Sequence, residues 1–180
     1  MLRIIADSTC DISKEDARKM GIQIVPISVR FGNEEFLDGV EITHEEFYTR
    51  LAECDELPKT SQPSPDTFMK VFNEAVAAGD DVLGIFISSD LSGTYQSACL
   101  AALDVEEETG KKLYMVDSRS ASIGAALLIR EAVKLRDAGV NAADIAAACT
   151  EMSKYIKLTA VVGSLKSVSY THLTLPTTER

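Results

Sequence analysis

Four predicted loops of this sequence are rich in hydroxyl groups, and each one follows a predicted strand or is expected to lie close to the carboxyl ends of the strands. They are residues 7–9 (Asp-Ser-Thr), 60–64 (Thr-Ser-Gln-Pro-Ser), 88–94 (Ser-Ser-Asp-Leu-Ser-Gly-Thr) and 117–120 (Asp-Ser-Arg-Ser). Neutral hydroxyls and the free amides of a helix start can hold an anion such as a carboxylate or a phosphate. If the segments meet at one sheet edge, they predict a site for such an anion.

Each segment taken alone has a simpler explanation, because a serine or threonine before a helix usually caps that helix. Capping does not explain why several such segments should converge. The turn formed by Ser92, Gly93 and Thr94 is the best candidate, since Gly93 lets the backbone approach closely and both hydroxyls flank a helix start. The further candidate binding residues are Ser8, Thr60, Ser61 and Ser118.

Other familiar site chemistries find little support in the residues. Neither phosphate-binding fingerprint, G-x-x-x-x-G-K-[ST] or G-x-G-x-x-G, occurs in the chain. A serine hydrolase needs a base, but His44 lies at the start of a helix predicted to be exposed, and His172 lies in an atypical tail. There is also no G-x-S-x-G elbow and no H-E-x-x-H set. The sequence therefore predicts no catalytic residue, no metal ligand and no cofactor.

The carboxylates of Asp7, Asp90 and Asp117 leave one enzymatic alternative open. If they meet near the sheet edge, they could perform acid/base chemistry or hold Mg²⁺, and the protein would be a phospho-ligand-binding α/β enzyme. The competing interpretation, which we favour, is that each carboxylate fixes its own loop by accepting hydrogen bonds from nearby amides.

The composition is that of a soluble protein with one compact core: 180 residues, 46% hydrophobic and 26% charged. A net charge of −10, with no clustering of the 18 basic residues, disfavours nucleic-acid binding. The longest uncharged stretch, 91–103, is too short and polar to span a bilayer, and Asp7 interrupts any signal peptide. We therefore expect a cytoplasmic protein without stable membrane insertion. The four cysteines form no Cys-x-x-Cys pair and are expected to be free thiols.

Strands and helices are predicted to alternate along the chain. The expected strands lie at 2–6, 22–31, 82–87, 113–117 and 157–162, and residues 31–37 are expected to form a turn into another short strand. The expected helices lie at 14–20, 44–52, 65–78, 120–138 and 142–155, and a further helix is expected to begin near residue 94. A phase slip in the second strand, next to Pro26, predicts a bulge or an edge strand. Such alternation indicates an α/β fold in which a mostly parallel sheet carries helices on both faces.

The last residues break this pattern. Residues 167–180 contain four threonines and no cap, turn or amphipathic period that would continue the domain. We therefore expect one α/β lobe over residues 1–166 and regard 167–180 as a non-native tail.

In order and spacing, the hydroxyl-rich segments resemble motifs of the DegV family. The resemblance rests on DSTCDI at 7–12, FG at 31–32 with DGVEI at 38–42, KTSQPS at 59–64, ISSDLSGTYQSA at 87–98 and VDSRSASIG at 116–124. It runs from about residue 2 to residue 166. Members of this family are bacterial fatty-acid-binding proteins that serve as binding subunits of fatty acid kinase.

This resemblance implies a long-chain fatty acid whose carboxylate is held by the hydroxyls of Thr60, Ser61 and Ser92. It also implies a separate ATP-using kinase, which converts the bound carboxylate to an acyl phosphate for phospholipid synthesis. The protein itself would then not be an enzyme. Ile85 and Ile87 could line the route of the acyl tail together with Leu91, although plain core packing is the stronger interpretation.

Family members continue into a second α/β lobe that covers the carboxylate end of the ligand. In this sequence the resemblance ends near residue 166, so we expect a truncated first lobe. An inactive truncated fragment is accordingly the remaining alternative to a lipid-binding module.

Overall fold

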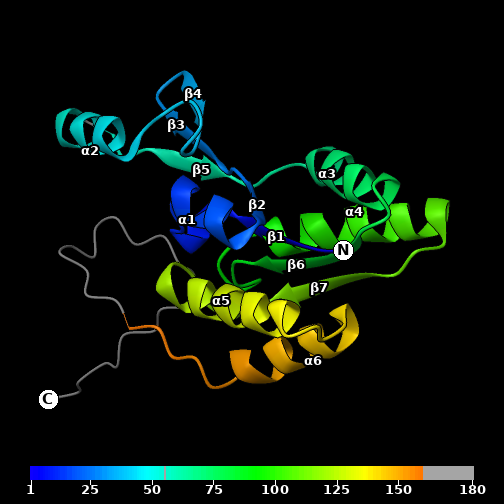
Figure 1. Cartoon of the computed structure of the whole chain (residues 1–180). Helices are drawn as coiled ribbons and strands as arrows, with labels where there is room; N and C mark the ends of the chain where they lie inside the picture. Colours follow the sequence, from blue (N-terminus) through cyan, green and yellow to red (C-terminus); the bar gives the residue numbers. More distant parts are fainter. Residues whose placement is uncertain (55, 160–180) are drawn as a thin grey trace, which may run out of the picture.

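The structure is a computed structural model that describes residues 1–54 and 56–159. Its main sheet has four parallel strands in the order β2-β1-β6-β7 (Figure 1). These strands are β1 (Leu2–Asp7), β2 (Ile22–Val25), β6 (Asp81–Phe86) and β7 (Leu113–Asp117). The predicted strands at 2–6, 82–87 and 113–117 are thereby confirmed. All four strands end at the same edge, and the hydroxyl-rich segments 7–9, 88–94 and 117–120 lie at the ends of β1, β6 and β7.

Helices cover both faces of this sheet, which confirms the predicted α/β fold (Figure 1). One face carries α3 (Pro65–Ala77) and α4 (Thr94–Thr109), and the other carries α1 (Lys14–Met20), α5 (Ile123–Asp137) and α6 (Ala142–Ser153). The first face packs around Phe68, Phe72 and Phe86, and the second packs around Leu83 and Ile129. Because β6 is covered on both sides, it is apolar along almost its whole length.

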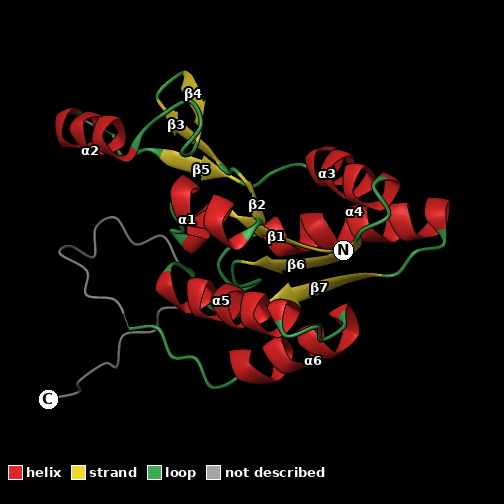
Figure 2. Cartoon of the chain, viewed as in Figure 1, coloured by secondary structure: helices red, strands yellow, loops and turns green. Residues whose placement is uncertain are grey.

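A second, antiparallel sheet with the order β4-β3-β5 projects from the main body together with one helix (Figure 2). It consists of β3 (Ser28–Phe31), β4 (Glu34–Leu37) and β5 (Lys59–Ser61), and the helix is α2 (His44–Glu53). The phase slip beside Pro26 marks the point where the chain leaves edge strand β2 for this sheet. The prediction that 60–64 is entirely a loop was wrong, because Thr60 and Ser61 belong to β5 and pair with β3.

At the carboxyl side of the sheet, one helix starts later than predicted, and one short helix was not predicted. Helix α5 begins at Ile123 rather than at residue 120, because Arg119 and Ser122 have φ values of 52° and 50°, which are incompatible with a right-handed helix. A short 3₁₀ helix, η1 (Ser8–Cys10), follows β1 directly. The side chains of Ser13, Thr43, Ser64 and Asn141 cap the amino ends of α1, α2, α3 and α6.

The end of the described chain differs from expectation. Helix α6 ends at Ser153, and residues 157–159 are not in a strand, although a strand was predicted over 157–162. Residues 160–162 and the predicted tail at 167–180 lie outside the described residues. The four cysteines are free thiols, as predicted, and burial raises the pKa of Cys10 and of Cys149 to about 11.

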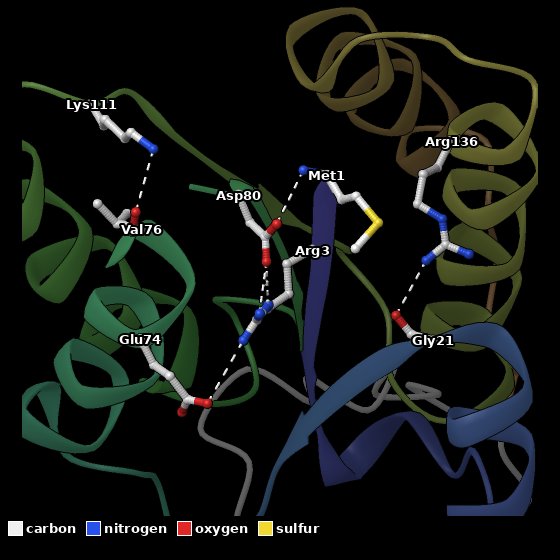
Figure 3. Close-up of polar contacts among 8 residues, drawn as sticks. All are labelled: Met1, Arg3, Gly21, Glu74, Val76, Asp80, Lys111 and Arg136. Atoms are coloured by element: carbon white, nitrogen blue, oxygen red, sulfur yellow. Dashed lines mark hydrogen bonds and ion pairs between the residues drawn. The ribbon is translucent and has the colours of Figure 1, made fainter. Parts of the chain in front are cut away.

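The amino ends of the strands are held by an ionic cluster around Asp80 (Figure 3). The carboxylate of Asp80 accepts hydrogen bonds from the Met1 amino group at 3.1 Å and from two guanidinium nitrogens of Arg3 at 2.7 and 3.1 Å. Glu74 lies 3.9 Å from the same guanidinium group. No helix in the described ranges 1–54 and 56–159 is long and apolar enough to cross a membrane.

Candidate functional site

A pocket of about 270 Å³ lies at the opposite edge, where the strands of the main sheet end. Its walls come from three separate parts of the chain, namely the link from β2 to β3, the end of β5, and the loop before α4. The lining residues are Ile27, Thr60, Ser61, Gln62, Leu91, Ser92 and Gly93. Four of the predicted binding residues, Thr60, Ser61, Ser92 and Gly93, therefore line one pocket.

The loop between β6 and α4 is fixed by hydrogen bonds to the loop after β7. The Ser88 amide donates to the carbonyl of Ser120 at 2.8 Å. The amide and hydroxyl of Ser89 donate to the Asp117 carboxylate at 3.2 and 2.5 Å. The amides of Leu91 and Ser92 then donate back to the Ser88 carbonyl. These bonds place Ser92 at the pocket wall.

Ser92 and Thr94 form a pair of hydroxyls at the start of α4. Their oxygens lie 2.9 Å apart, and the Thr94 amide donates to Ser92 Oγ at 3.3 Å. Thr94 is fully buried, whereas Ser92 is partly exposed on the wall. Thr94 therefore lies behind the pocket and contacts its surface through Ser92.

Gly93 is the N-cap residue of α4 and provides no side-chain cap for its first amides. A Cβ atom at this position would overlap the side-chain amide of Gln62, whose Cδ and Nε2 would lie 2.8 Å away. Nε2 of Gln62 donates a hydrogen bond to Ser97 Oγ at 2.9 Å, inside the first turns of α4. Gln62 was not among the predicted site residues.

The pocket wall is polar and uncharged. None of its seven lining residues carries a charge, and its apolar contribution comes from Ile27 and Leu91. Its possible donors are the hydroxyls, the Gln62 amide and the backbone amides at the start of α4. This arrangement can hold an acceptor-rich group, such as a carboxylate or a phosphate, by hydrogen bonds alone.

Asp7 lies under this edge and is almost completely buried, with 1% of its surface exposed. Its carboxylate accepts hydrogen bonds from the amides of Ile87 at 2.8 Å and Thr9 at 2.9 Å, and from the Thr9 hydroxyl. Burial nevertheless raises the pKa of Asp7 above its usual value, because desolvation penalises the charge more than these donors stabilise it. Asp7 thus ties the end of β1 to the end of β6.

The other two carboxylates of the enzymatic alternative do not join Asp7. Asp117 accepts bonds from Ser89 and from the Arg119 amide at 2.8 Å, so it fixes a loop in the same manner. Asp90 is exposed. In the described part of the chain, no group of three or more His, Cys, Asp or Glu side chains is arranged to hold a metal ion. The geometry of Asp7 and Asp117 favours loop fixation over a shared catalytic role.

Ser8 and Ser118 are not among the residues that line the pocket. Ser8 Oγ accepts a hydrogen bond at 3.2 Å from the amide of Ile27, which itself lines the pocket. Ser118 is fully buried, and its hydroxyl donates to the Ser120 carbonyl at 3.0 Å. Ile85 and Ile87 are buried core residues, whereas Leu91 is 43% exposed.

Comparisons with known proteins identify the family and the architecture. The sequence profile of a family described as "Uncharacterised protein, DegV family" matches residues 1–169. A DegV domain-containing protein of Clostridium perfringens is 38% identical over 167 residues, which are 93% of this chain and 59% of the relative.

Two solved structures show the same architecture. A stearic-acid-binding protein from Eubacterium ventriosum has a TM-score of 0.76 and 36% identity, covering 83% of this chain and 52% of its own. A DegV family protein from Thermus thermophilus, described by its fatty acid binding, has a TM-score of 0.75 and 33% identity, covering 85% and 53%. The present chain spans little more than half the length of these relatives.

Proposed function

Because this chain belongs to the DegV family, we propose that it holds the carboxylate of a long-chain fatty acid in the pocket at the carboxyl ends of its strands. The observation that carries the proposal is that Thr60 and Ser61 line the same pocket as Ser92 and Gly93, although about 30 residues separate the two pairs. The two related structures whose descriptions name fatty acid binding support the choice of ligand.

The hydroxyl geometry supports a carboxylate as the group that is held. Ser92 Oγ accepts from the Thr94 amide, and the buried Thr94 hydroxyl has Ser92 as its hydrogen-bond partner. If Thr94 donates in that contact, the hydrogen of Ser92 is free to donate into the pocket. Hydroxyls on β5 can donate from the facing wall, so both carboxylate oxygens find neutral donors.

The acyl tail supplies most of the affinity in this proposal, at ~0.8 kcal/mol for each buried CH₂. The pocket itself offers the tail only Ile27 and Leu91, because Ile85 and Ile87 are packed in the core. We therefore assign the pocket to the headgroup. In the whole protein, the tail would be buried in the protein interior, and the second lobe, which this chain does not span, would cover the carboxylate end.

The partner in this proposal is a separate fatty acid kinase, as the family motifs imply. A carboxylate oxygen of the bound acid would attack the γ-phosphorus of ATP, which yields an acyl phosphate and ADP. The present chain would present the carboxylate and contribute no catalytic residue. Asp7 and Asp117, two carboxylates at this end of the sheet, are already engaged with amides and hydroxyls.

Native mass spectrometry tests the proposal directly. The chain purified from bacteria, or incubated with palmitate, should carry an adduct of fatty-acid mass. The double variant Thr60→Ala, Ser92→Ala should lose it, because removing two headgroup donors costs about 2–3 kcal/mol. The matched control is Thr49→Ala with Thr150→Ala, which removes two hydroxyls that donate within exposed helical turns. Equal adduct in the double variant and the control would refute the assignment of the site.

A further inference from the structure

The pocket lies between two parts of the molecule that are built separately. Thr60 and Ser61 belong to the antiparallel sheet, which projects away from the main sheet (Figure 2). Ser92 and Gly93 belong to the loop before α4 in the main body. The distance between the two pairs of donors therefore depends on how the projecting sheet is held against the body.

Within the described residues, two side-chain hydrogen bonds fix the segments that join this sheet to the body. One runs from the Ile27 amide to Ser8 Oγ at 3.2 Å, beside β1. The other runs from Gln62 Nε2 to Ser97 Oγ at 2.9 Å and connects positions 35 residues apart. Only the second bond ties the strand that carries the pocket hydroxyls directly to α4.

We propose that Gln62 is a positioning residue for the ligand headgroup. Its side chain sets the distance between Thr60–Ser61 on one side of the pocket and Ser92–Gly93 on the other. This inference rests on the proposed function. Ser97 is a firm anchor because it is 97% buried and its own amide bonds to the Gly93 carbonyl. The side-chain amide of Gln62 thus extends over the first turn of α4.

The types of the contacting residues fit this role. Gly93 has no side chain, so the Gln62 amide can lie directly against its backbone. A larger residue at position 93 would displace the Gln62 side-chain amide from this position. A glutamine also spans the gap without adding charge, whereas a glutamate of the same length would place a negative group beside the ligand carboxylate.

The test compares the affinity of the chain for palmitate with its affinity for hexadecanol, which has the same tail but no carboxylate. Gln62→Ala should weaken palmitate binding about tenfold, equivalent to about 1.4 kcal/mol, and change hexadecanol binding less than about twofold. Ser97→Ala should also weaken palmitate binding. The double variant should bind palmitate no more weakly than Gln62→Ala does, because the two substitutions remove the same hydrogen bond. Gln96→Ala, an exposed glutamine on the same helix, is the matched control.

A second variant separates positioning from general stability. Gln62→Glu keeps the side-chain length and can accept a bond from the Ser97 hydroxyl, so it should retain hexadecanol binding while losing palmitate binding more than Gln62→Ala does. Equal palmitate affinity in Gln62→Ala and wild type would overturn the inference. An equal loss for both ligands would also overturn it, since that result indicates damage to the fold.

The inference can be decided apart from the proposed function. If the wild-type chain binds no palmitate, the proposed function fails for this chain. Hydrogen exchange in the ligand-free chain then decides the role of Gln62. Gln62→Ala should speed exchange of the amides in β5 and at Thr94 relative to Gln96→Ala, and unchanged rates would overturn the inference.

Discussion

The two ends of the four-stranded sheet each hold a carboxylate from the chain, and they do so with different partners. At the amino ends, Asp80 is surrounded by the Arg3 guanidinium and the Met1 amino group (Figure 3). At the carboxyl ends, Asp7 contacts amides and one hydroxyl. The pKa of Asp80 is lowered by its hydrogen bonds to cations, whereas the pKa of Asp7 is raised by burial.

This difference shows what the carboxyl ends of the strands can offer a ligand. Asp7 and Asp117 are both held there by combinations of amide and hydroxyl donors. A fatty-acid carboxylate in the adjoining pocket would meet donors of the same kind at Thr60 and Ser92. Recognition at this end would therefore depend on where neutral donors are placed, and a small change in spacing would matter more than a change in net charge.

The largest expected effect in this comparison comes from Asp7→Ala. It leaves the Ile87 and Thr9 amides without their acceptor next to the buried core, and an unsatisfied buried donor costs about 1–3 kcal/mol. We expect a loss of about 3 kcal/mol in the free energy of unfolding, measured by urea denaturation. Asp7→Asn, which keeps one carbonyl oxygen, should lose about half as much. A loss below about 1 kcal/mol in Asp7→Ala would show that these bonds are not what joins β1 to β6.

Asp80→Ala should have a smaller effect, although Asp80 has charged partners. Arg3 and the Met1 amino group are partly or fully exposed, so water can replace the lost carboxylate. We expect a loss of about 1–2 kcal/mol in the same urea experiment. Glu74→Ala, which removes a weaker contact with Arg3 at 3.9 Å, is the control and should change stability little. The comparison fails if Asp80→Ala costs more than Asp7→Ala.

Much of the main body could be predicted from local sequence, because its signals are local. The Thr43 capping box, the Ser64 cap before Pro65 and the apolar run of β6 each depend on neighbouring residues. The second sheet could be predicted only in part. Strand β5 has three exposed polar residues, and its pairing with β3, rather than any periodicity, makes it a strand.

The pocket shows the same division. The hydroxyl-rich turn at Ser92 could be identified from residue types, since glycine and hydroxyls before a helix favour anion binding. Gln62 could not, because its role depends on a contact with Ser97 that spans 35 positions. The placement of Ser118 away from the wall is also a three-dimensional result, set by its bond to Ser120 in a tight turn.

The pH dependence of stability should have opposite signs at the two ends. Asp80 has a folded pKa below its ordinary 3.8, so its contribution is present above pH 3.8 and is lost as the pH falls through the lowered value. Asp7 has a folded pKa above 3.8, so the folded state takes up the proton first as the pH falls toward 3.8. As the pH falls, the free energy of unfolding of the wild type should decrease relative to that of Asp80→Asn. Over the same range it should increase relative to that of Asp7→Asn. Urea unfolding across this range measures both slopes, and two slopes of the same sign would contradict the contrast.

The smallest expected effect is that of salt on ligand binding. Exposed ion pairs weaken as the Debye length shortens from about 14 Å at ~50 mM salt to about 4 Å at ~500 mM, but hydrogen bonds from neutral donors do not depend on screening. Since none of the seven residues lining the pocket is charged, the affinity for palmitate, measured by calorimetry, should change less than about twofold over this range. Hexadecanol, measured in parallel, reports any effect of salt on burial of the tail. A palmitate-specific weakening would mean that a cation contacts the headgroup, and the exposed Arg119 at this end of the sheet would be the first residue to substitute.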